Sequence, residues 1–168
     1  LGGRHEADLR SGAHNTAGIV GLAEAMRITV EDRAAELRRI EALRDRLAAG
    51  ILGAVDGVAE TVPTELRAAG LLQLVIDGVN SEALLVLLEH GGLMASAASS
   101  CASGALDPSH VLAAMGWSRE AAQGSLRLSL GWSSTDDDVD LADLGDLLGF
   151  HVADGVALAG GEDGHLDA

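Results

Sequence analysis

Apolar side chains recur every three to four residues in the first third of the chain, once after Asn15 and again over residues 30–49. Apolar residues at this spacing share one face of a helix, and Asn is favoured just before a helix begins. The pattern therefore predicts two amphipathic helices, the second of which ends at Gly50. The two apolar stripes consist of Ile19, Leu22, Ala23 and Met26, and of Leu37, Ile40, Leu43 and Leu47.

The middle of the chain has strand patterns on both sides of one more helix. Residues 71–76 are almost entirely apolar, which predicts a buried strand, and a short strand is expected near Thr61. Asn80 starts a helical pattern that glycines end at positions 91 and 92. Residues 93–95 are expected to form another short strand.

Polar and apolar residues alternate strictly over residues 125–130, so that the leucines share one face and Arg127 stands on the other. This alternation predicts a strand that holds one guanidinium away from the core. Two short helices are predicted before it, over 108–116 and over 118–123, because each follows a residue suited to a helix start.

The two ends of the chain have less regular patterns. Residues 1–14 are rich in Gly, Arg and His and are expected to form an irregular loop. A helix is predicted over 136–148, because Thr135 can cap it and the three aspartates that follow suit its first turn. Residues 150–168 show no periodicity and are expected to be a loosely structured tail.

Composition excludes several classes of protein. The net charge of −15 disfavours binding to nucleic acid or to an anionic membrane, and no apolar run approaches the ~20 residues of a membrane span. The single cysteine excludes an internal disulfide and fits a reducing compartment. Metal-ligand spacings such as CxxC and HExxH are absent, so no metal site is predicted. We therefore expect a soluble, cytoplasmic protein.

That cysteine, Cys101, lies in a run of serine, alanine and glycine with no large apolar neighbour between Ser96 and Gly104. Such a run predicts a mobile, solvated loop rather than part of the core. A buried, purely structural cysteine is the alternative interpretation. A thiol on a flexible loop, followed by a strand that presents Arg127, suggests a functional site.

Two long motifs resemble one family. The run SSCASGALDPSHVLAAMG with the later GSLRLSLG is similar to the C-terminal part of the NifS/IscS-type cysteine desulfurases, and GGRHEADLRSGAHNTAGIVGLAEAM resembles an earlier segment of the same enzymes. The motifs stand in the family's order, and the resemblance covers residues 2–149. The resemblance implies an enzyme that depends on pyridoxal phosphate and has the aspartate-aminotransferase fold.

The resemblance assigns roles to two residues. Cys101 matches the nucleophile that receives sulfur from L-cysteine as a persulfide, which leaves L-alanine; a transient iron–sulfur ligand is a further interpretation. Arg127 matches the arginine that binds the substrate carboxylate, for which its forked guanidinium is suited. A surface ion pair with an acid of residues 136–138 is the alternative for Arg127. His110 has a weaker claim to a role.

The resemblance also places cofactor contacts near the start of the chain. Ala13 stands where the family has a threonine that reaches the cofactor phosphate of the other subunit in a dimer, so that hydroxyl is lost. Ser11 and the Gly12 amide could take its place. His5 replaces a family glutamine, whereas Arg10 keeps the family's pattern and is interpreted as a residue at the dimer interface or near the cofactor.

All eleven basic Lys and Arg residues are arginines, so the chain has no lysine to hold pyridoxal phosphate as a Schiff base. We therefore expect a fragment of a homodimeric cysteine desulfurase that is inactive by itself. In the whole enzyme, sulfur would pass from Cys101 to an acceptor or iron–sulfur scaffold protein, for cluster assembly or tRNA thiolation. A non-catalytic sulfur carrier or dimerisation domain, with Cys101 only as an acceptor, is the alternative.

The order of the predicted elements, helices first and then strands mixed with helices, indicates an α+β fold. With the resemblance, the expected architecture is the C-terminal small domain and linking helices of the aspartate-aminotransferase (fold type I) architecture, without the large domain. We expect residues 1–30 to be a remnant of the large domain and the start of the linking helices, residues 31–149 to form the small domain, and residues 150–168 to form the tail.

Overall fold

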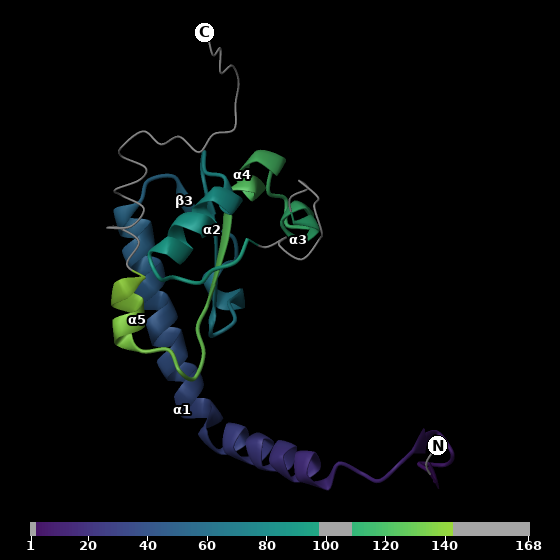
Figure 1. Ribbon diagram of the computed structural model, residues 1–168. Helices are drawn as coiled ribbons and strands as arrows, with labels where there is room; N and C mark the ends of the chain where they lie inside the picture. The colour runs from purple at the N-terminus through teal and green to yellow at the C-terminus, as the bar shows by residue number, and fades with distance from the viewer. Residues whose placement is uncertain (1–2, 98–108, 143–168) are drawn as a thin grey trace. The chain divides into compact units, whose positions relative to one another are not determined.

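The computed structural model describes residues 3–97 and 109–142 (Figure 1). The chain divides into two compact units, Leu1–Glu36 and Leu37–Ala168, and each is described by itself below. Helix α1 (Thr16–Ala54) contributes to both units. The predicted division into residues 1–30, 31–149 and 150–168 stays a prediction.

The second unit is built on a three-stranded antiparallel sheet with the order β3-β4-β5. Its strands are β3 (Val58–Glu60), β4 (Leu71–Ile76) and β5 (Ser125–Ser129). The strands predicted over 71–76 and 125–130 are confirmed, and the one expected near Thr61 lies just before that residue. Alternation along β4 and β5 gives the sheet two chemically different faces.

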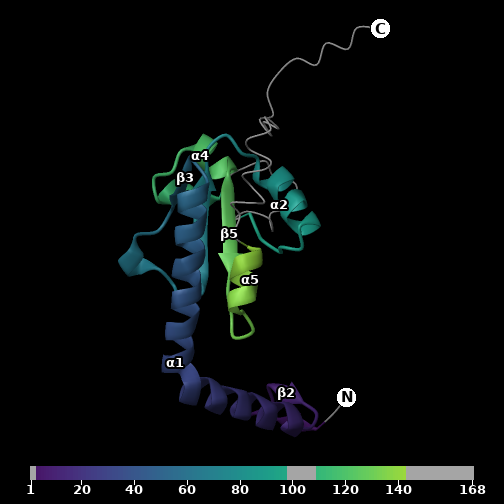
Figure 2. The ribbon, with the colours of Figure 1, turned by 90° about the vertical axis from the view of Figure 1, so that its left-hand side faces the viewer.

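One face of the sheet forms the main core. Helices α2 (Ser81–His90) and α5 (Asp136–Leu141) cover it together with the part of α1 after Leu37 (Figure 2). These surfaces bury branched aliphatic side chains almost completely, which supplies most of the hydrophobic stabilisation of the unit. The most deeply buried of them are Ile51, Leu72, Leu74, Leu84, Leu88 and Leu126.

The other face is covered only in part. Helices α3 (His110–Ala114) and α4 (Arg119–Gln123) pack on it around Val75 and lie on the opposite side of the sheet from α1 and α5 in Figure 1. Of the apolar residues in and just after α3, Leu112 is buried, whereas Val111 and Met115 are 53% and 45% exposed. Leu112 is the buried residue of α3, and Ala122 is that of α4.

Helix starts follow the predicted capping residues. The Asn80 side chain accepts hydrogen bonds from two backbone amides at the start of α2, and Ser118 does the same for one amide of α4. Thr135 and Asp138 form a reciprocal capping box at the start of α5. Helix α5 ends at Leu141 within the described residues, and the predicted continuation beyond position 142 lies outside them.

Two predictions in the second unit are wrong. Residues 93–95 form no strand, and only Ser96 pairs with β5, as an isolated bridge to Arg127. Helix α1 continues through Gly50 to Ala54. A glycine inside a helix costs about 1 kcal/mol, whereas Ile51 one residue later is fully buried, so that packing outweighs the local preference.

The first unit contains a short hairpin instead of the predicted irregular loop. Strands β1 (Arg4–His5) and β2 (Arg10–Ser11) pair antiparallel. The turn is made by four residues, 6–9, of which Glu6, Ala7 and Asp8 have positive φ values of 54–67°. Sequence patterns give no sign of such a turn, because none of these residues is a glycine.

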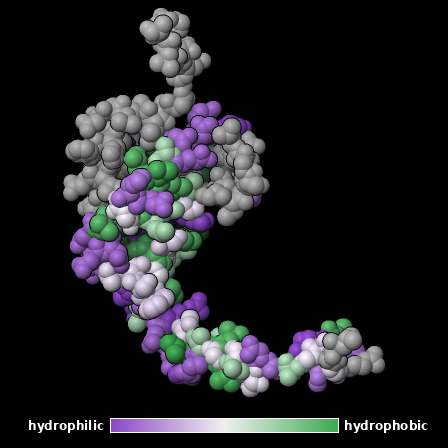
Figure 3. All heavy atoms as spheres, viewed as in Figure 1, coloured by the Kyte–Doolittle hydropathy of each residue, from purple (hydrophilic) through white to green (hydrophobic). Residues whose placement is uncertain are grey.

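Helix α1 begins where it was predicted, and the Asn15 side chain accepts a hydrogen bond of 3.0 Å from the Gly18 amide. The predicted break between two helices is wrong: α1 is one helix of 39 residues. Its middle lacks Gly and Pro, and Thr29 keeps its hydroxyl satisfied by donating to the Ala25 carbonyl. Figure 3 shows apolar side chains on the surface of its first half, where Ile19, Leu22 and Met26 are more than half exposed.

Candidate functional site

Arg127 lies in the middle of β5, on the face opposite the main core. Its neighbours Leu126 and Leu128 are 0% and 3% exposed, so the strand is anchored through them while the guanidinium stays accessible. In the register of the sheet, Gln73 of β4 stands directly across from Arg127. Both polar side chains therefore share the partly covered face.

Ser96 pairs with Arg127 on the side of β5 that faces away from β4. Its amide donates to the Arg127 carbonyl at 3.1 Å, and the Arg127 amide donates to the Ser96 carbonyl at 2.7 Å. The Arg127 guanidinium donates to the Ser96 hydroxyl at 3.5 Å, a long bond to a neutral partner. The backbone of Arg127 is thus held on both sides, by β4 and by Ser96.

The predicted alternative for Arg127, an ion pair with residues 136–138, does not occur. Asp136 pairs instead with Arg46 of α1, and Asp138 is engaged by Thr135. Hydrogen bonds from Thr135, chiefly from its hydroxyl and then from its amide, hold the pKa of Asp138 below its usual value. Among the described residues no carboxylate lies within ion-pair distance of Arg127, so its guanidinium can accept an anionic ligand.

A hollow of about 230 Å³ opens beside Arg127. Apolar side chains of β4 and of the loop after β3 form one part of its wall, among them Val62, Leu66 and Leu71. Its polar lining consists of Glu60, Arg67, Gln73 and Arg127. A small organic acid would find a cation and an apolar surface here side by side, which is the chemistry of a carboxylate-binding site.

Arg67, the second guanidinium of the hollow, is already engaged. It donates to the Glu60 carboxylate and lies 3.3 Å from Asp45. Asp45 also accepts from Arg44, which is 4% exposed and donates at 2.8 Å to the Ala68 carbonyl. This network ties the loop of the hollow to α1. Sequence reasoning missed it, because the partners are distant in sequence and follow no periodic pattern.

Cys101, the predicted nucleophile, lies outside the described residues. The described parts of the chain stop at Ala97 before it and resume at Ser109 after it, and both of these residues are buried. The roles of Cys101 as sulfur acceptor and of Arg127 as carboxylate ligand stay predictions.

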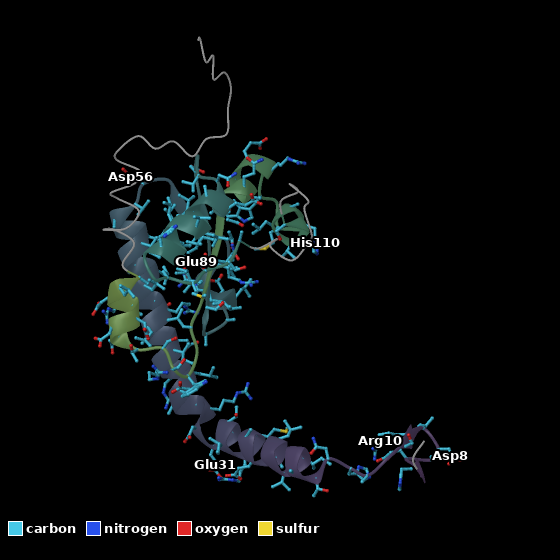
Figure 4. All side chains as sticks on the ribbon, viewed as in Figure 1. Asp8, Arg10, Glu31, Asp56, Glu89 and His110 are labelled. Atoms are coloured by element: carbon cyan, nitrogen blue, oxygen red, sulfur yellow. The ribbon has the colours of Figure 1, made fainter. Side chains whose placement is uncertain are left out.

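The residues predicted to meet a cofactor phosphate lie at the end of β2 and just after it, next to Arg10, which Figure 4 labels. Arg10 turns back on its own loop and donates to the carbonyls of Ser11 and Ala13 at 3.4 and 3.3 Å. Gly12 has a φ of +87°, a conformation that glycine favours. Ala13 offers no hydroxyl, so a phosphate here would depend on backbone amides, the exposed Ser11 hydroxyl and the neighbouring Arg10 guanidinium as donors.

Other candidate groups in the described residues do not form a site. His110 is exposed at the start of α3 (Figure 4), and His5 is exposed on β1. Over residues 3–97 and 109–142 no group of three or more His, Cys, Asp or Glu side chains is placed to hold a metal ion. None of the helices described is both long and apolar enough to cross a membrane.

Comparison with known proteins gives one consistent family. The model of the class-V aminotransferases matches residues 4–141. An IscS-like cysteine desulfurase of Mycobacterium tuberculosis is 42% identical over 142 residues, which are 84% of this chain and 36% of that protein. The cysteine desulfurase NifS of Azotobacter vinelandii is 37% identical over 139 residues, 83% of this chain and 35% of that protein. The chain thus spans about a third of the length of these relatives.

Solved structures agree with the sequence relatives. A NifS-like protein superposes with a TM-score of 0.72 at 34% identity, over 89% of this chain and 38% of that one. A NifS-like protein from Rickettsia africae, at 23% identity and a TM-score of 0.70 over 93% of this chain and 39% of that one, shares the fold. The predicted α+β fold class, a small-domain portion of the aminotransferase architecture, is confirmed.

Proposed function

This chain belongs to the class-V aminotransferase family, and we propose that it is the substrate-binding and sulfur-accepting part of a cysteine desulfurase. Relatives in two bacterial genera carry that name at 42% and 37% identity. The observation that carries the proposal is Arg127: a guanidinium on a fixed strand, beside a hollow, with no carboxylate partner among the described residues. In this role it binds the carboxylate of L-cysteine.

Cys101 completes the proposed chemistry. Its thiolate forms an S–S bond with the substrate sulfur as the carbon–sulfur bond breaks, and the carbon takes the electron pair and a proton to become the methyl group of L-alanine. The products are L-alanine and a Cys101 persulfide. The outer sulfur then passes to an acceptor or scaffold protein, for iron–sulfur cluster assembly or tRNA thiolation, in a homodimeric cytoplasmic enzyme.

By themselves, the residues of this chain cannot hold pyridoxal phosphate, the cofactor of the proposed enzyme. No lysine is present to bond its aldehyde, and Ala13 lacks the hydroxyl expected to meet its phosphate. We therefore assign to this chain only the contacts made by Arg127 and Cys101.

A hybrid enzyme, in which this chain replaces the matching segment of the mycobacterial relative, tests the proposal. Arg127→Lys keeps the charge but loses the fork, so KM for L-cysteine should rise about tenfold, and Arg127→Gln should raise it about a hundredfold. Arg38→Lys, on the exposed surface of α1, is the matched control. Unchanged KM in both Arg127 variants would remove this residue from the substrate site.

A further inference from the structure

The hollow beside Arg127 contains two guanidiniums that differ in their partners. Arg67 is bound by the Glu60 carboxylate and lies 3.3 Å from Asp45, and its side chain is 16% exposed. Arg127 has the neutral Ser96 hydroxyl as its side-chain partner and is exposed. A ligand that enters the hollow therefore meets one compensated and one uncompensated positive charge.

The difference in charge compensation between Arg67 and Arg127 limits the ligands that the hollow can hold. One carboxylate can bind at Arg127 in place of water, with the rest of the ligand against Val62, Leu66 and Leu71. A second carboxylate near Arg67 would meet Glu60 as well, and like charges at close range repel strongly in a partly buried site. The Glu60 side chain is 11% exposed, and its Oε1 is buried without a hydrogen-bond partner among the described residues, so little solvent screens it.

We propose that Glu60 is a specificity-determining residue: by occupying Arg67, it makes the hollow selective for ligands with one carboxylate and against dicarboxylates. The inference rests on the proposed role of Arg127 as the carboxylate ligand. Applied to amino-acid substrates, the selection favours a small neutral side chain such as that of cysteine and rejects aspartate and glutamate. The apolar part of the wall is consistent with this selection because it offers no further cation.

Replacing Glu60 with glutamine changes the charge without changing the size of the side chain. Arg67 keeps Asp45 as a partner, so its guanidinium is not left wholly uncompensated in the variant. The glutamine oxygen can still accept the Arg67 hydrogen bond, but the negative charge that repels a second anion is gone. Glu60→Gln should therefore admit dicarboxylates without weakening the binding of monocarboxylates.

The test is titration of the 168-residue chain with propionate and with succinate, followed by NMR shifts of the β5 amides and of the Arg127 side chain. Wild type should bind propionate more tightly than succinate. Glu60→Gln should bind succinate about tenfold more tightly and propionate almost as before. Glu65→Gln, exposed on the neighbouring 3₁₀ turn Thr64–Leu66, is the matched control and should not differ from wild type.

The outcomes separate this inference from the proposed function. If propionate binding is lost in Arg127→Gln but Glu60→Gln leaves the ratio of the two affinities unchanged, the role of Glu60 is wrong and the carboxylate site stands. If Arg127→Gln binds propionate like wild type, or wild type binds neither acid, the carboxylate site itself is contradicted. Adding Arg67→Gln to Glu60→Gln should abolish the gain for succinate. If Glu60→Gln does not fold, Glu60→Ala, which also removes the charge, should show a gain for succinate in the same direction, and its absence would overturn the proposal.

Discussion

Gly124→Ala should destabilise the second unit strongly, because this glycine lets α4 approach the central strand. A Cβ at position 124 would lie 3.0 Å from the carbonyl carbon of Ile76 and in severe overlap with its carbonyl oxygen. Both are backbone atoms of β4, which is paired on both sides and cannot move aside cheaply. The same approach places the Ile76 amide 3.0 Å from the Gly124 carbonyl, so relief of the overlap also strains a hydrogen bond.

Overpacking a well-packed interior costs about 1–3 kcal/mol, and a hydrogen bond contributes about 1 kcal/mol net, so the loss should be about 2–4 kcal/mol. For a chain of this size that lowers Tm by about 5–15 °C. Thermal and urea unfolding followed by circular dichroism measure the change. Gly131→Ala is the control, since a Cβ there meets nothing within 4 Å. Equal Tm values for the two variants would show that the approach of α4 to β4 is looser than described.

Two further predictions follow from the site and from α5. The 168-residue chain with added pyridoxal phosphate should release no L-alanine from L-cysteine, since it has no lysine, and alanine production by the pure chain would contradict this. Thr135→Ala should raise the pKa of Asp138 in an NMR titration, because the lowered pKa depends on Thr135. The depressed pKa stabilises the fold above the unfolded value of about 4, and that contribution is lost as pH falls through the folded value. The difference in stability between wild type and variant should therefore be larger at pH 7 than in acid, where only the lost hydrogen bond from the Asp138 amide to the Thr135 hydroxyl remains. A difference that does not change with pH would contradict this.

Local patterns were sufficient for the strand that carries Arg127. Alternation over 125–130 fixes which side chains enter the core, and burial of Leu126 and Leu128 leaves Arg127 on the other face whatever the rest of the fold does. Helix starts at Asn80 and Thr135 were equally predictable, because a capping side chain bonds to amides only two or three residues away.

The hollow was not predictable from such patterns. Its Arg67–Glu60 pair depends on how a loop folds back onto β3 and α1, and Arg44 of α1 is buried against that loop. The hairpin turn at Glu6–Asp8 was missed for a related reason: positive φ at residues other than glycine is imposed by pairing of the flanking strands and has no signature in composition. The resemblance supplied a role for Cys101, which lies outside the described residues.

The most direct test of the account is to find where the sulfur goes. The hybrid enzyme should be mixed with L-cysteine, its persulfides trapped by alkylation, and the peptide that contains Cys101 analysed by mass spectrometry. The account predicts one extra sulfur atom on Cys101, formed together with L-alanine, and loss of both products in Cys101→Ser with Tm unchanged. Alanine and sulfur released by Cys101→Ser at the wild-type rate would contradict it.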